Sequence, residues 1–214
     1  MRCISQAFKS KTYIALAAIA ATQPASAALI DFDANTGGAF STGEQLGIAA
    51  IGSGNCVGIS AGGSASGSAL CGGDFNGGSI TPSESFIISN VNFDQVTAID
   101  FSLAARANTS SERFEPSSSS FYDFFEVKAA GERLAIFEVD PNNNRQLFST
   151  ELNAPTAESG AFQHFSIFGS LLDAASGIGD LEFVFQTTGT NERLGLDTIS
   201  ISSVPLPSSS IAFL

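Results

Sequence analysis

The pattern of apolar residues constrains the fold of this chain more than any other feature. Short apolar runs separated by turn residues recur along the sequence, and no long stretch shows the 3.6-residue period of a helix. Runs of this length and spacing are typical of an antiparallel β-sandwich. Strands are expected at residues 28–33, 46–51, 56–60, 67–71, 85–89, 95–106, 121–129, 133–139, 146–150, 162–168, 181–188 and 195–203.

Two of the connections between these strands have clear turn chemistry. Ala130-Gly131 predicts a tight hairpin, and the segment 140–144, Asp-Pro-Asn-Asn-Asn, predicts the next turn, because Gly and Asn tolerate positive φ and Pro presets φ. Residues 171–176 are expected to form one helical turn. We predict a single domain over residues 28–203, of which residues 28–80 are Gly-rich and irregular.

The charge balance excludes some classes of partner. The chain has 9 basic and 21 acidic residues, and three of the basic ones lie within the first eleven residues. Nucleic-acid binding depends on Lys and Arg that neutralise phosphates, so no nucleic-acid partner is expected. Docking on an anionic membrane is disfavoured for the same reason. The 19 Phe residues and the absence of Trp predict a core filled largely by Phe.

The N-terminus has the three parts of a secretory signal peptide. Arg2, Lys9 and Lys11 form a positive region, residues 13–21 form an apolar Ala-rich region, and Ala-Ser-Ala at 25–27 is a cleavage site. We therefore expect export to remove residues 1–27. The mature protein is expected to be secreted or held in the bacterial cell envelope.

The C-terminal end carries a second targeting pattern. Val204, Pro205, Leu206 and Pro207 are followed by three Ser and then by Ile-Ala-Phe-Leu. This segment resembles the opening of the PEP-CTERM class of C-terminal sorting tags, which continue into a membrane-spanning helix and an Arg-rich end. A spanning helix needs about 20 apolar residues, and this tail supplies four. Residues 204–214 are interpreted as a truncated tag, with export and sorting machinery as implied partners and no stable membrane span in this chain.

The second half of the chain shows a resemblance at the level of the fold. The runs 98–103, 121–127, 162–167, 181–185 and 194–201 follow one another in an order that resembles the jelly-roll β-sandwich modules of secreted bacterial proteins. In those modules a strand with a Leu-Asp-Asn-Ile-like sequence closes the sheet, and Thr198 stands here where Asn is usual. The resemblance implies an all-β, antiparallel, jelly-roll-like sandwich and specifies fold better than activity.

The same resemblance leads to a calcium hypothesis. Asp31, Asp33 and Asn35 have the oxygen spacing that begins many Ca²⁺ loops, although the sixth and twelfth positions are Thr, which excludes an EF-hand. Jelly-roll modules often hold a structural Ca²⁺ between the first and closing strands. That resemblance makes Asp33 and Asp197 the main candidate ligands, with Asp31 and Asn35 assisting. The alternative is that all four are strand-end and turn residues. No other cofactor is expected.

Two cysteines remain once the signal peptide is removed. Cys56 and Cys71 form an even pair in an oxidising compartment, which predicts a disulfide between them. The alternatives are free thiols or a metal pair. The disulfide would close a loop of about 15 residues around the most Gly- and Ser-rich stretch of the chain.

Catalytic motifs are weak in this sequence. Residues 58–62 match the G-x-S-x-G nucleophile elbow around Ser60, but the Gly- and Ser-rich continuation cannot start the helix that this motif needs. His164, the single His, lies in an expected strand and is interpreted as exposed or hydrogen-bonded. Carboxylates at 123, 126, 138 and 140 could pair for glycoside hydrolysis, and are interpreted as solvated strand positions.

Taken together, these features predict a secreted, non-enzymatic β-sandwich of the cell envelope or extracellular matrix that is associated with exopolysaccharide. The alternative is a carbohydrate-binding module, for which the lack of Trp and the single Tyr of the mature chain are unfavourable. A secreted serine hydrolase is the third interpretation.

Overall fold

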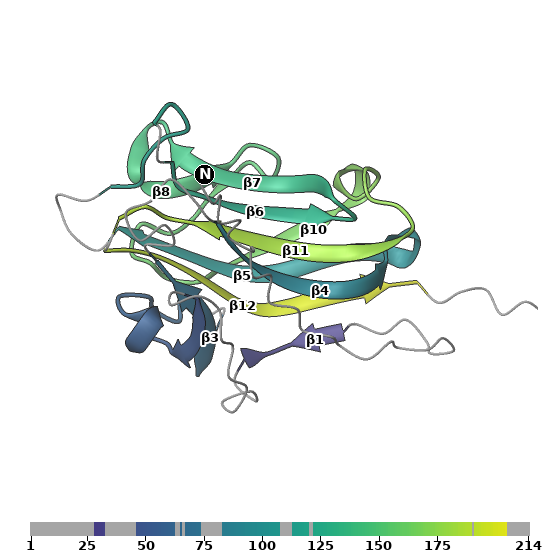
Figure 1. Cartoon of the computed structure of the whole chain (residues 1–214), viewed down its shortest axis with the longest axis horizontal. Coiled ribbons are helices and arrows are strands. Elements are labelled where there is room, and N and C mark those ends of the chain that lie inside the picture. Colours follow the sequence, from purple (N-terminus) through teal and green to yellow (C-terminus); the bar gives the residue numbers. More distant parts are fainter. Residues whose placement is uncertain are drawn as a thin grey trace, which may run out of the picture.

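The computed structural model describes residues 28–32, 46–62, 65, 67–73, 83–107, 113–119, 122–189 and 191–204. Their strands form two antiparallel sheets, which confirms the predicted all-β sandwich. Figure 1 shows β7, β6, β11 and β4 side by side in that order. The predicted signal peptide and Pro205 to Leu214 lie outside the described residues. Among the described helices, none is long and apolar enough to cross a membrane.

The first sheet, sheet A, carries the central hairpin of the fold. Its order is β4-β11-β6-β7-β8-β9. The strands are β4 (Glu84–Asn92), β6 (Phe124–Ala129), β7 (Glu132–Asp140), β8 (Asn143–Ser149), β9 (Ala154–Pro155) and β11 (Ile178–Gln186).

The second sheet, sheet B, contains the first and the last strands of the domain. Its order is β10-β5-β12-β3-β2, and β1 also pairs with β12. The strands are β1 (Ala28–Ile30), β2 (Gly47–Ala50), β3 (Ser68–Gly72), β5 (Val96–Ala107), β10 (Gln163–Phe168) and β12 (Glu192–Ser203). From β3 onward the chain passes repeatedly between the two sheets, in the strand orders expected of a jelly roll.

The predicted turns follow from local backbone chemistry. Ala130 and Gly131 have φ of 51° and 87°, and two positive φ values are what a two-residue hairpin turn requires. At the next turn, Asp140 Oδ1 accepts a hydrogen bond of 2.8 Å from the Asn142 N–H. The expected helical turn at 171–176 begins slightly earlier, as the 3₁₀ helix η4 (Gly169–Leu171).

The core between the sheets is filled by Phe, as predicted. Phe101 of sheet B lies within 6.3 Å, ring centroid to centroid, of four other Phe rings, mostly in tilted or edge-to-face arrangements. These partners are Phe125, Phe137, Phe165 and Phe183. Because Phe101 and Phe165 come from sheet B and the other three come from sheet A, this group of rings joins the two layers.

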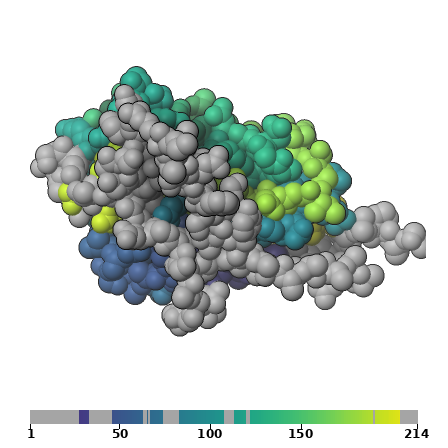
Figure 2. Space-filling model, in the orientation of Figure 1, coloured from purple at the N-terminus to yellow at the C-terminus, as the bar shows by residue number. Residues whose placement is uncertain are grey.

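A second, smaller cluster lies on the opposite side of sheet B. It contains six buried residues: Cys56, Ile59, Ala69, Cys71, Ala104 and Phe162. They bring the loop 51–62, here called the disulfide loop, down onto the outer face of the sheet. Figure 2 shows the described residues 46–62, 65 and 67–73, in dark blue, as a lobe at the lower left of the molecule. The outer face of sheet B is therefore covered by this lobe around Ala69, Cys71 and Ala104.

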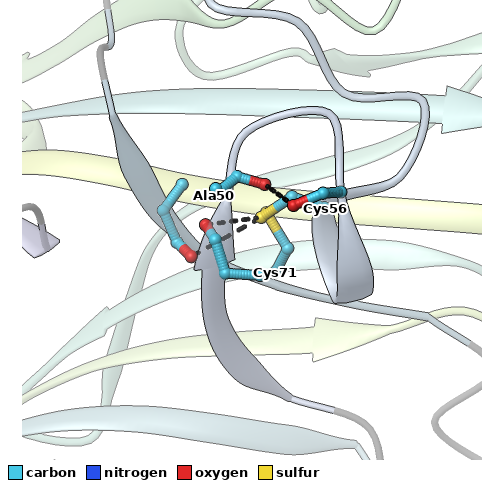
Figure 3. The surroundings of a disulfide bond; sticks show 6 residues. Ala50, Cys56 and Cys71 are labelled. Atoms are coloured by element: carbon cyan, nitrogen blue, oxygen red, sulfur yellow. Dashed lines mark hydrogen bonds between the residues drawn. A yellow bond between two sulfur atoms is a disulfide. The ribbon is translucent and has the colours of Figure 1, made fainter. Parts of the chain in front are cut away.

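Cys56 and Cys71 are joined by a disulfide in this lobe (Figure 3), with 2.06 Å between the sulfur atoms and 5.1 Å between the Cα atoms. The carbonyl oxygens of Ala49 and Ala69 each lie 3.5 Å from Cys56 Sγ. The strand predicted at 56–60 is wrong. Cys56 ends the 3₁₀ helix η2 (Gly54–Cys56), and turns follow, because Gly54 and Gly58 both take positive φ.

Candidate functional site

The part of the outer face of sheet B that the disulfide loop leaves uncovered is made of aligned side chains from four strands. Strand pairing sets Phe168 beside Ala98 and Ser202, and the next outward row contains Ser166, Asp100, Ser200 and Leu29. We call these seven residues and His164, two positions before Ser166 on β10, the open face. Alternation along each strand points them away from the Phe core.

Two apolar side chains on this face are exposed to solvent. Phe168 is 64% exposed and Leu29 is 63% exposed. The side chains between them are small, Ala98 and Ser200 among them. Neither of the two large apolar side chains is therefore flanked by a bulky neighbour on this face, and most of the groups between them are Ser hydroxyls. Phe168 is the single aromatic among the large apolar side chains that are exposed in the described ranges. It sits at the last position of β10, where the backbone pairs with Ala98 of β5.

Polar groups of the open face meet at Asp100. Ser166 Oγ donates a hydrogen bond to Asp100 Oδ1, and His164 Nε2 lies 3.5 Å from the same oxygen. The His164 side chain is 55% exposed, in agreement with the predicted exposed strand His. His164 and Phe168 are four residues apart on one strand, which places them about 13 Å apart. A ligand that touched both would be the size of an oligosaccharide or a short peptide.

This trio of Ser, His and Asp is not a catalytic triad. In a triad the imidazole stands between the two oxygens and uses one ring nitrogen for each. Here His164 approaches both Ser166 Oγ, at 3.4 Å, and Asp100 Oδ1 through the same atom, Nε2. The Ser166 hydroxyl also donates its hydrogen bond directly to Asp100, and not to the imidazole. The imidazole therefore has no path by which to take a proton from Ser166 and be oriented by Asp100.

Ser60, the centre of the G-x-S-x-G match, is held by backbone bonding. It forms a parallel bridge with Ala161, and its N–H donates to the Gly160 carbonyl oxygen at 3.0 Å. Within the described part of the chain, a turn follows at Ala61 and Gly62 and the next element is β3. A nucleophile elbow needs a helix at that point. The local backbone therefore does not present Ser60 as a nucleophile.

The residues of the calcium hypothesis are placed only in part. The first and closing strands do pair, with Ile30 opposite Ile199, so Asp31 follows directly beyond this pair. Asp31 is exposed, and Asp197, two positions before Ile199, is buried. Asp33 and Asn35 lie outside the described residues. The two ends of the domain are thus adjacent, as the hypothesis requires.

A buried cluster of carboxylates lies elsewhere. Glu115, Asp123 and Glu192 have carboxylate oxygens within 4.8 Å of one another, and Asp123 and Glu192 are fully buried. The cluster joins the loop 113–119, the entry to β6 and the start of β12. Sequence reasoning missed it, because its members are far apart in the chain. The prediction that Asp123 and Glu126 are solvated is wrong, since both side chains are buried.

Hydrogen bonding in this cluster favours a shared proton. Burial, then the side-chain hydrogen bond with Glu115 and the nearby charge of Glu192, raise the pKa of Asp123 to about 9. The Glu115 N–H donates to Asp123 Oδ2, and the Thr188 N–H donates to Oδ1 at 2.8 Å. Both oxygens of Asp123 already have donors, which leaves little room for a cation that takes six or more oxygens. The arrangement is consistent with a protonated Asp123 whose hydrogen bonds connect the entry to β6 with Glu115 of the loop 113–119 and with Thr188, near Glu192 at the start of β12.

Comparison with known proteins gives distant structural likenesses. No protein-family model and no curated protein matches the sequence. The K1 cleaved adhesin domain of Lys-gingipain from Porphyromonas gingivalis is similar at 12% identity and a TM-score of 0.46, over 83% of this chain and 98% of that one. CBM27-1 of Caldicellulosiruptor saccharolyticus, solved with mannohexaose, is similar at 13% identity and a TM-score of 0.48, over 85% of this chain and 99% of that one.

Proposed function

We propose that this chain is an exported, non-enzymatic β-sandwich that binds extracellular polysaccharide, and that the open face is its binding surface. The exposure of Phe168 on this face carries the proposal. A ring that is 64% exposed on a rigid strand offers an apolar surface on which the C–H face of a sugar ring can stack. The adjacent hydroxyl and carboxylate groups provide hydrogen-bond partners for sugar hydroxyls.

Phe168 is preferred over the other ring pair outside the core. Tyr122 and Phe124 stack on each other with their centroids 5.1 Å apart. Phe124 is only 8% exposed, so that pair offers little open ring surface to a ligand. The open face also explains how a chain without Trp can present an aromatic platform, because alternation along β10 sets Phe168 on the same side as Ser166 and His164.

The absence of an enzymatic role is part of the proposal. The geometry of Ser166, His164 and Asp100 lacks the relay of a triad, and Ser60 lacks its helix. The carboxylates of the buried cluster lie within 4.8 Å of one another through one oxygen each, and Asp123 and Glu192 are fully buried. A substrate bond could not enter between them.

Affinity electrophoresis of the full chain through gels that contain soluble polysaccharides tests the proposed function. We expect retardation by at least one polysaccharide and loss of that retardation in Phe168→Ala. Ile178→Ala is a matched control, because Ile178 is 72% exposed but lies on β11 of the other sheet. Equal retardation of all three proteins would place binding elsewhere, and no retardation by any polysaccharide would contradict the proposed function.

Export and sorting remain part of the proposal. We propose that residues 1–27 are removed and that Ala28, which begins β1, becomes the mature N-terminus. The segment from Val204 to Pro207 is proposed to address the protein to envelope sorting machinery. N-terminal mass spectrometry of secreted material should find Ala28 or a residue within a few positions of it. Secreted protein that retains Met1 would contradict this.

A structural calcium ion between the two chain ends also remains a proposal, supported by the pairing of β1 with β12 beside Asp31. A cation that binds only the folded state stabilises it by mass action. The Tm should therefore rise in Ca²⁺ relative to EDTA, and the exposed Asp31→Asn change should reduce that difference. A Tm that is the same in Ca²⁺ and in EDTA would refute the calcium hypothesis.

A further inference from the structure

We infer that the open face selects uncharged polysaccharide chains over anionic ones; this inference rests on the proposed function and names the ligand class of the same site. The observation that carries it is the distribution of charge around Phe168. The open face contains the carboxylate of Asp100, one His and no Lys or Arg. Two further carboxylates lie beside it: the buried Asp197, which is opposite Ser102 in the row of His164, and the exposed Asp31, two residues beyond Leu29.

Every Lys and Arg beyond residue 27 lies away from this face. Lys128, Arg133 and Arg145 are on strands of sheet A, and Arg113 bonds to Asn144 of that sheet. Arg106 and Arg193 are directly opposite each other at the far end of sheet B. Arg106 is six residues along β5 from Asp100, or roughly 20 Å. That exceeds the Debye length of about 8 Å at physiological ionic strength, so its charge is largely screened there.

The orientation of Arg106 separates it further from the open face. Its Nη1 donates to the carbonyl oxygens of Gly58, at 2.7 Å, and Ser159, at 3.1 Å. These bonds hold the guanidinium against the disulfide loop. An acidic sugar stacked on Phe168 would therefore find the carboxylate of Asp100 nearby and no cation to pair with. The net charge of −12 of the whole chain also repels anionic polymers.

The polar groups of the open face match the hydroxyl groups of sugars. One oxygen of the Asp100 carboxylate already accepts a hydrogen bond from the Ser166 hydroxyl. The other polar groups, Ser200 and Ser202 among them, are hydroxyls that both donate and accept hydrogen bonds. Sugar hydroxyls also do both. The chemistry of the face thus matches an uncharged, hydroxyl-rich chain.

The experiment compares two classes of polysaccharide by affinity electrophoresis and titration of the full chain: neutral (β-glucan, mannan and xylan) and anionic (alginate and polygalacturonate). We expect binding to a neutral chain, undiminished in 0.5 M NaCl, and no binding to alginate. Asp100→Asn keeps the Ser166 bond but loses the charged acceptor, and should weaken neutral binding about tenfold. Asp100→Lys places a cation on the face and should create alginate binding.

The outcomes separate this inference from the proposed function. Wild-type binding to alginate in preference to all neutral chains, abolished in Phe168→Ala, would overturn the ligand class and leave the open face as the binding site. Neutral binding that Asp100→Asn leaves unchanged would also overturn it. Circular dichroism and thermal melts of each variant, compared with Ile178→Ala, establish that the lost binding is not lost folding.

Discussion

Ile30 of the first described strand lies directly opposite Ile199 of the closing strand β12. This pair joins the two ends of the domain within one sheet, and both side chains pack against the main core. Immediately before Ile199, β12 contains an extra residue relative to β5, a β-bulge between Asp197 and Ser200. The bulge contains Thr198, the position at which the jelly-roll modules that this sequence resembles usually have Asn.

Thr198, in this bulge, has φ of 50°. A β-branched residue is strained at positive φ, whereas Asn adopts this conformation with less cost. We therefore predict that Thr198→Asn raises the free energy of unfolding by about 1 kcal/mol, or Tm by roughly 2–4 °C. Thr97→Asn, at an exposed position of the extended strand β5, is the control and should give no increase. A Thr198→Asn protein that melts below the wild type would refute the strain argument.

The Cys56–Cys71 disulfide should stabilise the domain. The two cysteines are 15 residues apart, and the chain-entropy model gives about 3 kcal/mol for a loop of that length. We expect the double variant Cys56→Ala/Cys71→Ala to lose about that amount in urea denaturation, and the reduced wild type to match it. Peptide mapping in which both thiols of unreduced secreted protein are alkylated would show that the bond does not form.

Stability should fall as the pH rises. Burial is the main reason that the pKa of Asp123 rises to about 9 in the folded protein, from its ordinary value of 3.8. Between these values the folded state holds a proton that the unfolded state has lost. The stabilisation is therefore complete below about pH 4 and is lost through about pH 9, with a slope of at most about 1.4 kcal/mol per pH unit. Urea denaturation at pH 5, 7 and 9 measures this slope.

The Asp123→Asn variant isolates the source of this dependence. The amide cannot ionise, so the slope above pH 7 should flatten, and Asp173→Asn, which removes an exposed charge, should leave it unchanged. Burial raises the pKa of Glu84 to about 7. Glu84 therefore also lowers the free energy of unfolding as the pH rises, but only between about pH 4.5 and 7, so it does not contribute to the slope above pH 7. A wild-type stability that increases from pH 7 to 9 would contradict the shared-proton description of the cluster.

Local patterning was sufficient for most of the fold. Alternation located the long strands, β5 and β12 among them, because each buries one face against the core between the sheets. The strand expected at 56–60 does not form. The apolar residues there, Cys56 and Ile59, belong to a turn that the disulfide links to β3 and that packs on the outer face of sheet B. The two-residue strand β9 gives no periodic signal at all.

The candidate site was less accessible to sequence reasoning. Alternation in the predicted strand 162–168 already places His164, Ser166 and Phe168 on one face, so part of the open face could have been found. Its neighbours, Asp100 and Leu29, required the register between strands far apart in the chain. The carboxylates of Glu115, Asp123 and Glu192 meet only when three non-adjacent segments converge, and no spacing in the sequence indicates this.

The most direct test of the account follows the environment of residue 168 during binding. The chain contains no Trp, so Phe168→Trp introduces a single fluorescent ring at the open face, and Ile178→Trp does the same on sheet A. Addition of a neutral polysaccharide should shift the emission of Phe168→Trp to shorter wavelength, in a saturable way, because the ring becomes covered. The Ile178→Trp emission should stay unchanged. A shift at position 178 without one at position 168 would contradict binding at the open face.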